Sequence, residues 1–121
     1  MIGFGKVPVY NKLVRDKIPE IIEQDGSIPV TKVLNGVQFK AALHEKLLEE
    51  VHEYLAAETR EECREERADI AEVLHWLDKL DDFAPEGIED LRVRKAEARG
   101  GFAERIFLIE THTNNPEGEP Q

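Results

Sequence analysis

The sequence predicts an all-α fold, an antiparallel helical bundle with short extended segments before and after it. Two long stretches, residues 37–57 and 61–80, repeat apolar residues every three to four positions, and a third helical stretch covers about 85–99. This spacing is typical of amphipathic helices. Residues 58–60 leave room only for a short turn. We therefore expect the two long helices to lie antiparallel.

The N-terminal part is expected to hold shorter elements. Residues 9–15 are extended, and Asp16 is expected to cap a short helix at about 17–24. Pro19 falls in the first turn of this helix, where proline is tolerated. The β-branched residues of 28–34 predict a short strand.

Turn residues separate the later elements. Residues 35–36 are Asn-Gly, which predicts a turn before the first long helix. Gly100 and Gly101 are expected to stop the third helix. Residues 102–110 alternate in polarity and are expected to form a strand or an extended arm.

One domain is expected over residues 1–112, followed by a polar, disordered tail at 113–121. A chain of 121 residues buries only a small core, so association of subunits is favoured. Leu74, Trp76, Leu77 and Leu80 occupy more than a narrow seam of their helix, which predicts that a second copy covers them in a homodimer or a higher homo-oligomer. The alternative is that other segments of the same chain cover these faces.

Composition narrows the classes of partner. The net charge is −10 at pH 7, which disfavours a nucleic-acid backbone and an anionic membrane surface as partners. The sequence shows neither a membrane-spanning stretch nor the apolar run of a signal peptide, and Cys63 is the only cysteine. We therefore expect a cytoplasmic protein without nucleic-acid or membrane partners.

Four acidic residues form two pairs with i,i+3 spacing, Glu50 with Glu53 in the first long helix and Glu66 with Asp69 in the second. Antiparallel helices can offer both pairs to one gap. Such an all-oxygen site suits a hard divalent cation, for which Mg²⁺ is the usual cellular choice and Mn²⁺ a substitute. In a chain with 26 acidic residues, either pair alone is better explained as part of a charged surface, so the metal site rests on the two pairs together and on the position of Glu66.

Glu66 is the most informative of the four. On a helical wheel at roughly 100° per residue it falls in the middle of an apolar stripe with Ile70, Val73 and Leu77, and Asp69 lies at the edge of that stripe. An unpaired buried carboxylate costs several kcal/mol. A metal ion, a cationic partner or a raised pKa must therefore compensate for Glu66.

The first acidic pair is expected to be less buried. Glu50 borders the apolar stripe of its helix, Glu53 lies one step further out, and Glu49 lies almost opposite the stripe and is expected to be solvated. The apolar stripe of this helix comprises Leu43, Leu47, Leu48, Val51, Leu55 and Tyr54.

Positive charge is scarce and lies toward the two ends of the chain. The candidates for phosphate binding are Lys12, Arg15, Lys95, Arg99, Gly100 and Gly101. Glycine amides and nearby basic side chains can hold phosphate oxygens. For the late group the alternative is a helix C-terminus with a glycine cap and cations that complement the helix dipole. The early pair can equally be surface or salt-bridge residues.

A di-iron site is a second metal chemistry to weigh. Glu49-x-x-His52 and Glu72-x-x-His75 have the spacing of the elements found in di-iron bundles. The helical wheel places both pairs away from the apolar faces, whereas a di-iron site needs them inside the bundle. We therefore disfavour this alternative.

Four segments carry a family resemblance: YNKLVRDKIPEII (10–22), KLLEEVHE (46–53), EERAD (65–69) and KAEARGGFAERI (95–106). In this order they resemble the MazG-like, all-α NTP pyrophosphatases, most closely the short branch labelled phosphoribosyl-ATP pyrophosphohydrolase-like. The resemblance implies a helical dimer in which Glu50, Glu53, Glu66 and Asp69 ligate Mg²⁺. It also implies hydrolysis of nucleoside triphosphates to a monophosphate and pyrophosphate, as in house-cleaning members that act on non-standard or surplus nucleotides.

The residues suggest roles for such a reaction. A carboxylate, Glu50 or Glu53, would take a proton from the attacking water, with Glu49 as a third candidate. The basic candidates would stabilise the departing pyrophosphate. Two alternatives stay open: phosphoribosyl-ATP as the substrate, and a non-catalytic helical interaction module.

Overall fold

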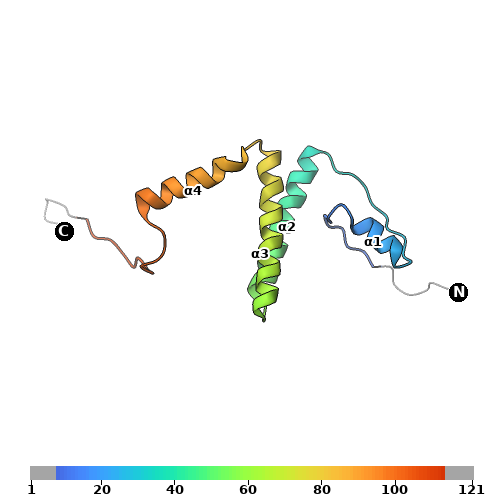
Figure 1. Ribbon diagram of the computed structural model, residues 1–121, viewed down its shortest axis with the longest axis horizontal. Coiled ribbons are helices and arrows are strands. Elements are labelled where there is room, and N and C mark those ends of the chain that lie inside the picture. Colours follow the sequence, from blue (N-terminus) through green and yellow to red (C-terminus); the bar gives the residue numbers. More distant parts are fainter. Residues whose placement is uncertain (1–7, 114–121) are drawn as a thin grey trace. The chain divides into compact units, whose positions relative to one another are not determined.

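The computed structural model describes residues 8–113, and in this range it contains four helices and no strand (Figure 1). The helices are α1 (Ile18–Gln24), α2 (Gly36–Ala56), α3 (Arg60–Leu80) and α4 (Pro85–Arg99). The all-α class is thus confirmed. The predicted tail lies outside the described residues apart from its first position.

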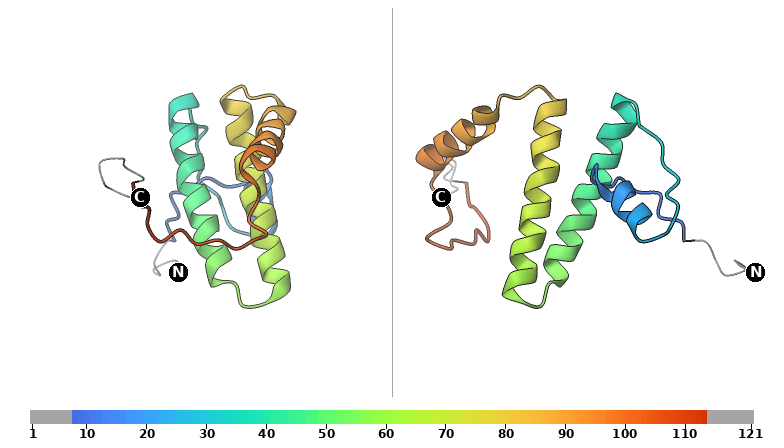
Figure 2. Two further views of the ribbon diagram at one scale, coloured as in Figure 1. Left: turned by 90° about the vertical axis from the view of Figure 1, so that its left-hand side faces the viewer. Right: turned by 45° about the vertical axis from the view of Figure 1, so that its right-hand side comes forward.

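The chain divides into two compact units, Met1–Pro85 and Glu86–Gln121. The first unit is built on α2 and α3, which run antiparallel beside each other as a helical hairpin (Figure 2). Its most buried apolar side chains are Leu43 on α2 and Val73 on α3, which are 3% and 6% exposed. The core therefore lies along the α2–α3 seam.

Capping boxes set where the two long helices begin. The Asn35 side chain accepts a hydrogen bond from the Gln38 backbone N–H at 2.9 Å, and the Gln38 side chain accepts one from the Asn35 N–H at 3.2 Å. Thr59 and Glu62 exchange the same two bonds, at 3.0 and 3.2 Å, at the start of α3. Reciprocal bonds of this kind satisfy backbone donors that a helix start leaves free. In place of the turn predicted at Asn35-Gly36, Asn35 caps α2 and Gly36 is the first residue of that helix.

Two expectations for the shorter elements were wrong. Lys17, not Asp16, is the N-cap residue of α1, while Pro19 does lie in the first turn. Residues 28–34 form no strand within the described chain, and residues 102–110 form none either, which excludes the strand of the two alternatives for that segment. A strand needs a partner for its backbone hydrogen bonds, and residues 8–113 supply none to these two segments.

Several apolar side chains of the hairpin are exposed. Leu48 and Leu55 on α2 are 61% and 73% exposed, and Leu74 and Trp76 on α3 are 45% and 40% exposed. A two-helix hairpin gives each helix one helical neighbour, so it covers a seam narrower than the apolar stripe. The sequence correctly placed a core on these helices, and these exposed side chains agree with an apolar face wider than the hairpin covers; its coverage by a second copy stays a prediction.

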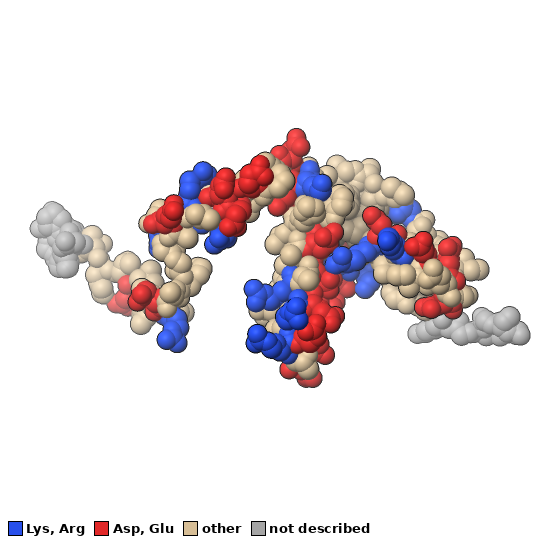
Figure 3. Space-filling view, in the orientation of Figure 1, with Lys and Arg blue, Asp and Glu red and all other residues tan. Residues whose placement is uncertain are grey.

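The polar surface of the hairpin carries charges of both signs. Acidic and basic side chains lie beside one another over the end where α2 passes into α3 (Figure 3). One such pair joins Arg64 and Glu61 at 2.9 Å within α3. Exposed pairs of this kind contribute little to stability. Among the described residues no helix is both long and apolar enough to cross a membrane.

The second unit consists of α4 and the segment after it. The helix ends at Arg99 and is followed by Gly100, whose φ of 85° lies in the left-handed region and whose N–H donates to the Ala96 carbonyl at 2.8 Å. Glycine adopts this conformation without strain, so it is a favoured residue just past a helix end. Gly100 therefore has the helix-capping role that the sequence left open for it.

Candidate metal centre

Three carboxylates from α2 and α3 meet at the helical seam: Glu50, Glu53 and Glu66, called here the carboxylate triad. One oxygen of each lies within 4.8 Å of the other two. Among residues 8–113 no other group of His, Cys, Asp and Glu side chains has this spacing. Glu50 is buried, Glu66 is half-buried and Glu53 is exposed, so the triad leads from the helical seam to solvent.

Two oxygens of the triad lack hydrogen-bond donors. Oε1 of Glu50 and Oε1 of Glu66 are both buried, and no donor in the described part of the chain reaches them. A buried acceptor without a hydrogen-bond partner lowers the stability of the folded state. Most buried polar atoms in proteins therefore have such a partner. Oxygens are the ligands that Mg²⁺ and Mn²⁺ prefer, so the donor set fits a hard divalent cation.

Glu66 is shifted toward its protonated form. Desolvation, the hydrogen bond that a protonated Glu66 can share with the Glu50 carboxylate, and the negative charges of Glu53, Glu50 and Asp69 raise the pKa of Glu66 to about 7. Such a hydrogen bond between two carboxyl groups requires a proton on one of them. A proton or a cation is therefore needed where these side chains meet.

Glu50 is more buried than its sequence position suggested. The residue is 6% exposed, and the expectation that the first acidic pair is the less buried one was wrong for Glu50. Glu50 follows the core residue Leu43 by seven positions, and Glu66 precedes the core residue Val73 by seven. Seven residues make about two turns, so each carboxylate shares a face with a core side chain. This spacing is the sequence signal that identifies Glu50.

Asp69, the fourth predicted ligand, has a different partner. Its Oδ1 accepts a hydrogen bond from Nη2 of Arg15 at 2.7 Å, and Asp69 is not part of the triad. Arg15 belongs to the segment before α1, so this ion pair ties that segment to α3. Asp69 is still close enough for its charge to raise the pKa of Glu66.

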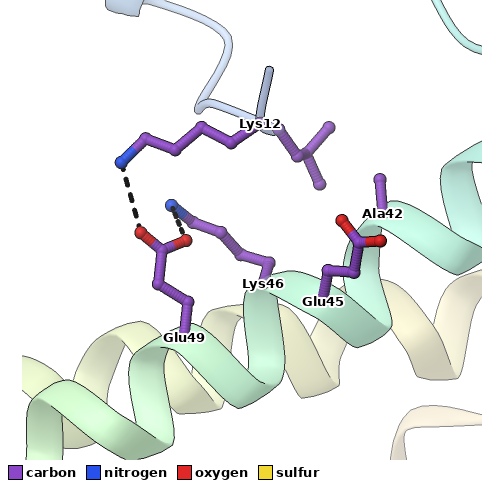
Figure 4. A pocket seen from close by; sticks show the side chains of 6 residues that line it. Lys12, Ala42, Glu45, Lys46 and Glu49 are labelled. Carbon is purple, nitrogen blue, oxygen red and sulfur yellow. Dashed lines mark hydrogen bonds and ion pairs between the residues drawn. The ribbon is translucent and has the colours of Figure 1, made fainter. Parts of the chain in front are cut away.

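A second ion-pair cluster lies on α2 (Figure 4). Lys12 donates to Oε2 of Glu49 at 3.2 Å, and Nζ of Lys46 lies 3.4 Å from Oε1 of the same carboxylate. Burial opposes ionisation of Glu49, but the two lysines outweigh it and lower its pKa. The expectation of a solvated Glu49 was therefore wrong, because Lys12 and Lys46 hold it. This cluster borders a cavity of about 240 Å³ lined by Lys12, Leu13, Ala42, Glu45, Lys46 and Glu49.

Lys46 is a site residue that the sequence reasoning missed. Its Nζ also lies 3.5 Å from Oε2 of Glu50, so it partly balances the charge of the buried carboxylate. The signal was available, because Lys46 precedes Glu50 by four positions and side chains at that spacing are neighbours on a helix. Lys46 thus links the ion-pair cluster to the triad.

The residues of the di-iron alternative do not come together. Glu72 accepts a hydrogen bond from the indole N–H of Trp76 at 2.8 Å, and His75 packs edge-on against the same indole, with ring centroids 5.8 Å apart. Within residues 8–113, neither Glu72 nor His75 belongs to a group with metal-ligand spacing. These contacts give no support to the di-iron alternative.

The late phosphate candidates lie in the second unit. Lys95 and Arg99 are exposed on α4, and Gly100 and Gly101 follow its last residue. A phosphate role for these four residues stays a prediction. The early candidates Lys12 and Arg15 contact α2 and α3 through the ion pairs described above.

Comparison with known proteins identifies a relative of part of the chain. An uncharacterized protein of Mycolicibacterium smegmatis is 48% identical over 54 residues, which cover 45% of this chain and 55% of that protein. The chain thus spans about half the length of this relative. No protein-family profile matches the chain, and no solved structure matches it.

Proposed function

We propose that this protein is a Mg²⁺-dependent nucleoside triphosphate pyrophosphohydrolase, which converts an NTP or dNTP and water to the monophosphate and pyrophosphate. The observation that carries the proposal is the carboxylate triad with its two unpartnered buried oxygens, to which residues 8–113 offer no donor. The triad lies in the two segments that resemble the acidic motifs of MazG-like enzymes. Non-standard or surplus nucleotides in the cytoplasm are the proposed substrates.

Glu50, Glu53 and Glu66 would hold the cation, with Asp69 as a fourth ligand. When bound, Mg²⁺ or Mn²⁺ supplies positive charge next to the phosphates and lowers the pKa of a water. Glu50 and Glu66 are turned into the seam, whereas Glu53 is the exposed member. Glu53 is therefore the better placed of the two candidate bases to take a proton from a water on the substrate side.

Basic side chains would receive the phosphates. Lys12 and Arg15 both reach the hairpin, where Lys12 pairs with Glu49 and Arg15 pairs with Asp69. Guanidinium and ammonium groups bind phosphate oxygens through charge-assisted hydrogen bonds, and these stabilise the charge of departing pyrophosphate. The same role is proposed for Lys95, Arg99, Gly100 and Gly101, because glycine amides and nearby basic side chains can hold phosphate oxygens.

The proposal includes a homodimer. The exposed leucines of α2 and the half-exposed Trp76 of α3 leave apolar surface on a hairpin with a narrow core. Apolar surface of this kind is commonly covered by a second subunit in helical bundles. A dimer would also bring more than one chain near each site, as the family resemblance implies.

The test is release of pyrophosphate from a panel of dNTPs and NTPs, with Mg²⁺ and with EDTA. We expect monophosphate and pyrophosphate in equal amounts, only with the metal. Products containing inorganic phosphate instead of pyrophosphate would contradict the reaction. If no nucleotide is hydrolysed, a non-catalytic helical module becomes the better interpretation.

A further inference from the structure

We propose that Arg15 is a positioning residue that controls whether Asp69 joins the metal site. In the free protein Arg15 holds Asp69 apart from the carboxylate triad. The phosphates of an incoming substrate then replace Asp69 as the partner of Arg15. Asp69 becomes free to act as a fourth ligand of the metal site. The inference deepens the proposed function and rests on it for the identity of the phosphate ligand.

The geometry pairs these two residues directly. Nη2 of Arg15 donates to Oδ1 of Asp69 at 2.7 Å. Asp69 follows Glu66 by three positions on α3, so the two carboxylates are neighbours on one face of the helix. Asp69 is thus next to the triad while its charge is matched by Arg15. The guanidinium of Arg15 therefore competes with a metal ion for the negative charge and the orientation of the Asp69 carboxylate.

The second observation is the incomplete state of the triad. Glu50 is 6% exposed and its Oε1 has no donor within the described chain, and one carboxylate oxygen of Glu50 lies within 4.8 Å of oxygens of Glu53 and Glu66. A buried oxygen in this position indicates a cation ligand. Three side-chain ligands leave room for a fourth, and Asp69 is the adjacent acid.

The exchange of partners is energetically inexpensive. The side chains of Arg15 and Asp69 are 57% and 37% exposed, and ion pairs at such exposure are weak. A phosphate group offers a guanidinium several charged oxygens in a geometry that suits two parallel hydrogen bonds. Asp69 in turn gains a divalent cation. Each partner therefore leaves a weak ion pair for a stronger interaction.

Lys12 provides a matched comparison on the same segment. Its Nζ lies 3.2 Å from Oε2 of Glu49, at exposures of 44% and 31%, so this pair resembles Arg15–Asp69 in type. Glu49, however, is outside the triad. Removing Lys12 changes the local charge by the same amount without freeing a neighbour of Glu66.

The experiment is a double-mutant cycle of Mn²⁺ affinity in nucleotide-free protein, measured from the electron paramagnetic resonance signal of free Mn²⁺. We expect Arg15→Ala to tighten Mn²⁺ binding about two- to sixfold, the range that follows when a weak surface ion pair no longer competes for the ligand. In the Asp69→Asn background the same change should have no such effect. Arg15→Lys should behave closer to wild type.

The control separates ligand release from general electrostatics. Lys12→Ala should change the Mn²⁺ affinity by the same factor in the wild-type background and in the Asp69→Asn background. If Arg15→Ala also acts equally in both backgrounds, the exchange is overturned. If no variant binds Mn²⁺, the exchange falls together with the metal site. If the cycle comes out as expected but no nucleotide is hydrolysed, the proposed function fails and the exchange stands.

Discussion

Glu50 on α2 and Glu66 on α3 bring carboxylate oxygens within 4.8 Å of each other, and each has a buried Oε1 atom for which residues 8–113 provide no hydrogen-bond donor. Two ionised carboxylates at this distance repel each other, and burial strengthens the repulsion. The pair therefore needs a proton or a cation, and this requirement gives rise to the predictions below.

Replacing Glu66 with Gln should lower pyrophosphohydrolase turnover at least ~100-fold, because the amide removes a charged metal ligand. The helix content should stay unchanged by circular dichroism. Glu65→Gln is the matched control, since Glu65 is the exposed neighbour on the same helix. Near-full activity of the Glu66→Gln protein would refute the metal site.

In EDTA, the Glu66 contribution should make the folded protein less stable as pH rises from about 4.5 to about 7. The pKa of Glu66 is about 7 when folded against an ordinary value of 4.5. Between these values the folded state holds a proton that the unfolded state has lost, so stability decreases with pH and then levels off. Urea unfolding of wild type and Glu66→Gln at pH 5 and pH 8 checks this. An equal pH response of the two proteins would contradict it.

Mg²⁺ should raise the melting temperature, since it binds the folded state and relieves repulsion in the triad. A ligand at 100 times its Kd stabilises by about 2.7 kcal/mol. Glu66→Gln should shrink this gain and raise the melting temperature in EDTA, because one source of repulsion is removed. In a purely structural ion-pair network the metal-free variant would instead melt lower, with no Mg²⁺ effect in either protein.

Replacing Lys46 with Met should destabilise the metal-free protein by about 1–3 kcal/mol, because the buried Glu50 loses its nearest cation. Mg²⁺ should restore part of this loss. Lys40→Met is the control on the same helix, where an exposed ion pair with Asp81 at 2.7 Å is lost at a cost of about 0–1 kcal/mol. Chemical denaturation compares the two variants, and equal losses would speak against a role for Lys46 at the triad.

The protein should have a mass above the 13.8 kDa of one chain in solution. Leu55→Glu should shift it toward the monomer, because a charge would replace a leucine that is 73% exposed on α2. Val30→Glu, at a 96% exposed position outside the helices, should leave the mass unchanged. Light scattering at micromolar concentration decides the question. A monomeric wild type with full activity would rule out the dimer.

Local signals in the sequence predicted the helices well. The 3.6-residue period located α2 and α3, and Pro85 with the Gly100-Gly101 pair located α4, each to within one or two residues, because helical hydrogen bonds join residues that are close in the chain. Pro19 in the first turn of α1 followed from the same local rules. The predicted strand at 28–34 failed because strand formation depends on a partner that local sequence does not reveal.

The sequence by itself determined the all-α class, the acidic pairs on two neighbouring helices and the unusual position of Glu66 on an apolar stripe. The tertiary structure decided which acids meet. It buries Glu50 beside Glu66. It also places Asp69 in a hydrogen bond with Arg15, a residue 54 positions earlier in the chain. It also pairs Glu49 with Lys12. Helical periodicity specifies the face on which a residue lies, whereas ion pairs between distant segments depend on how those segments pack together.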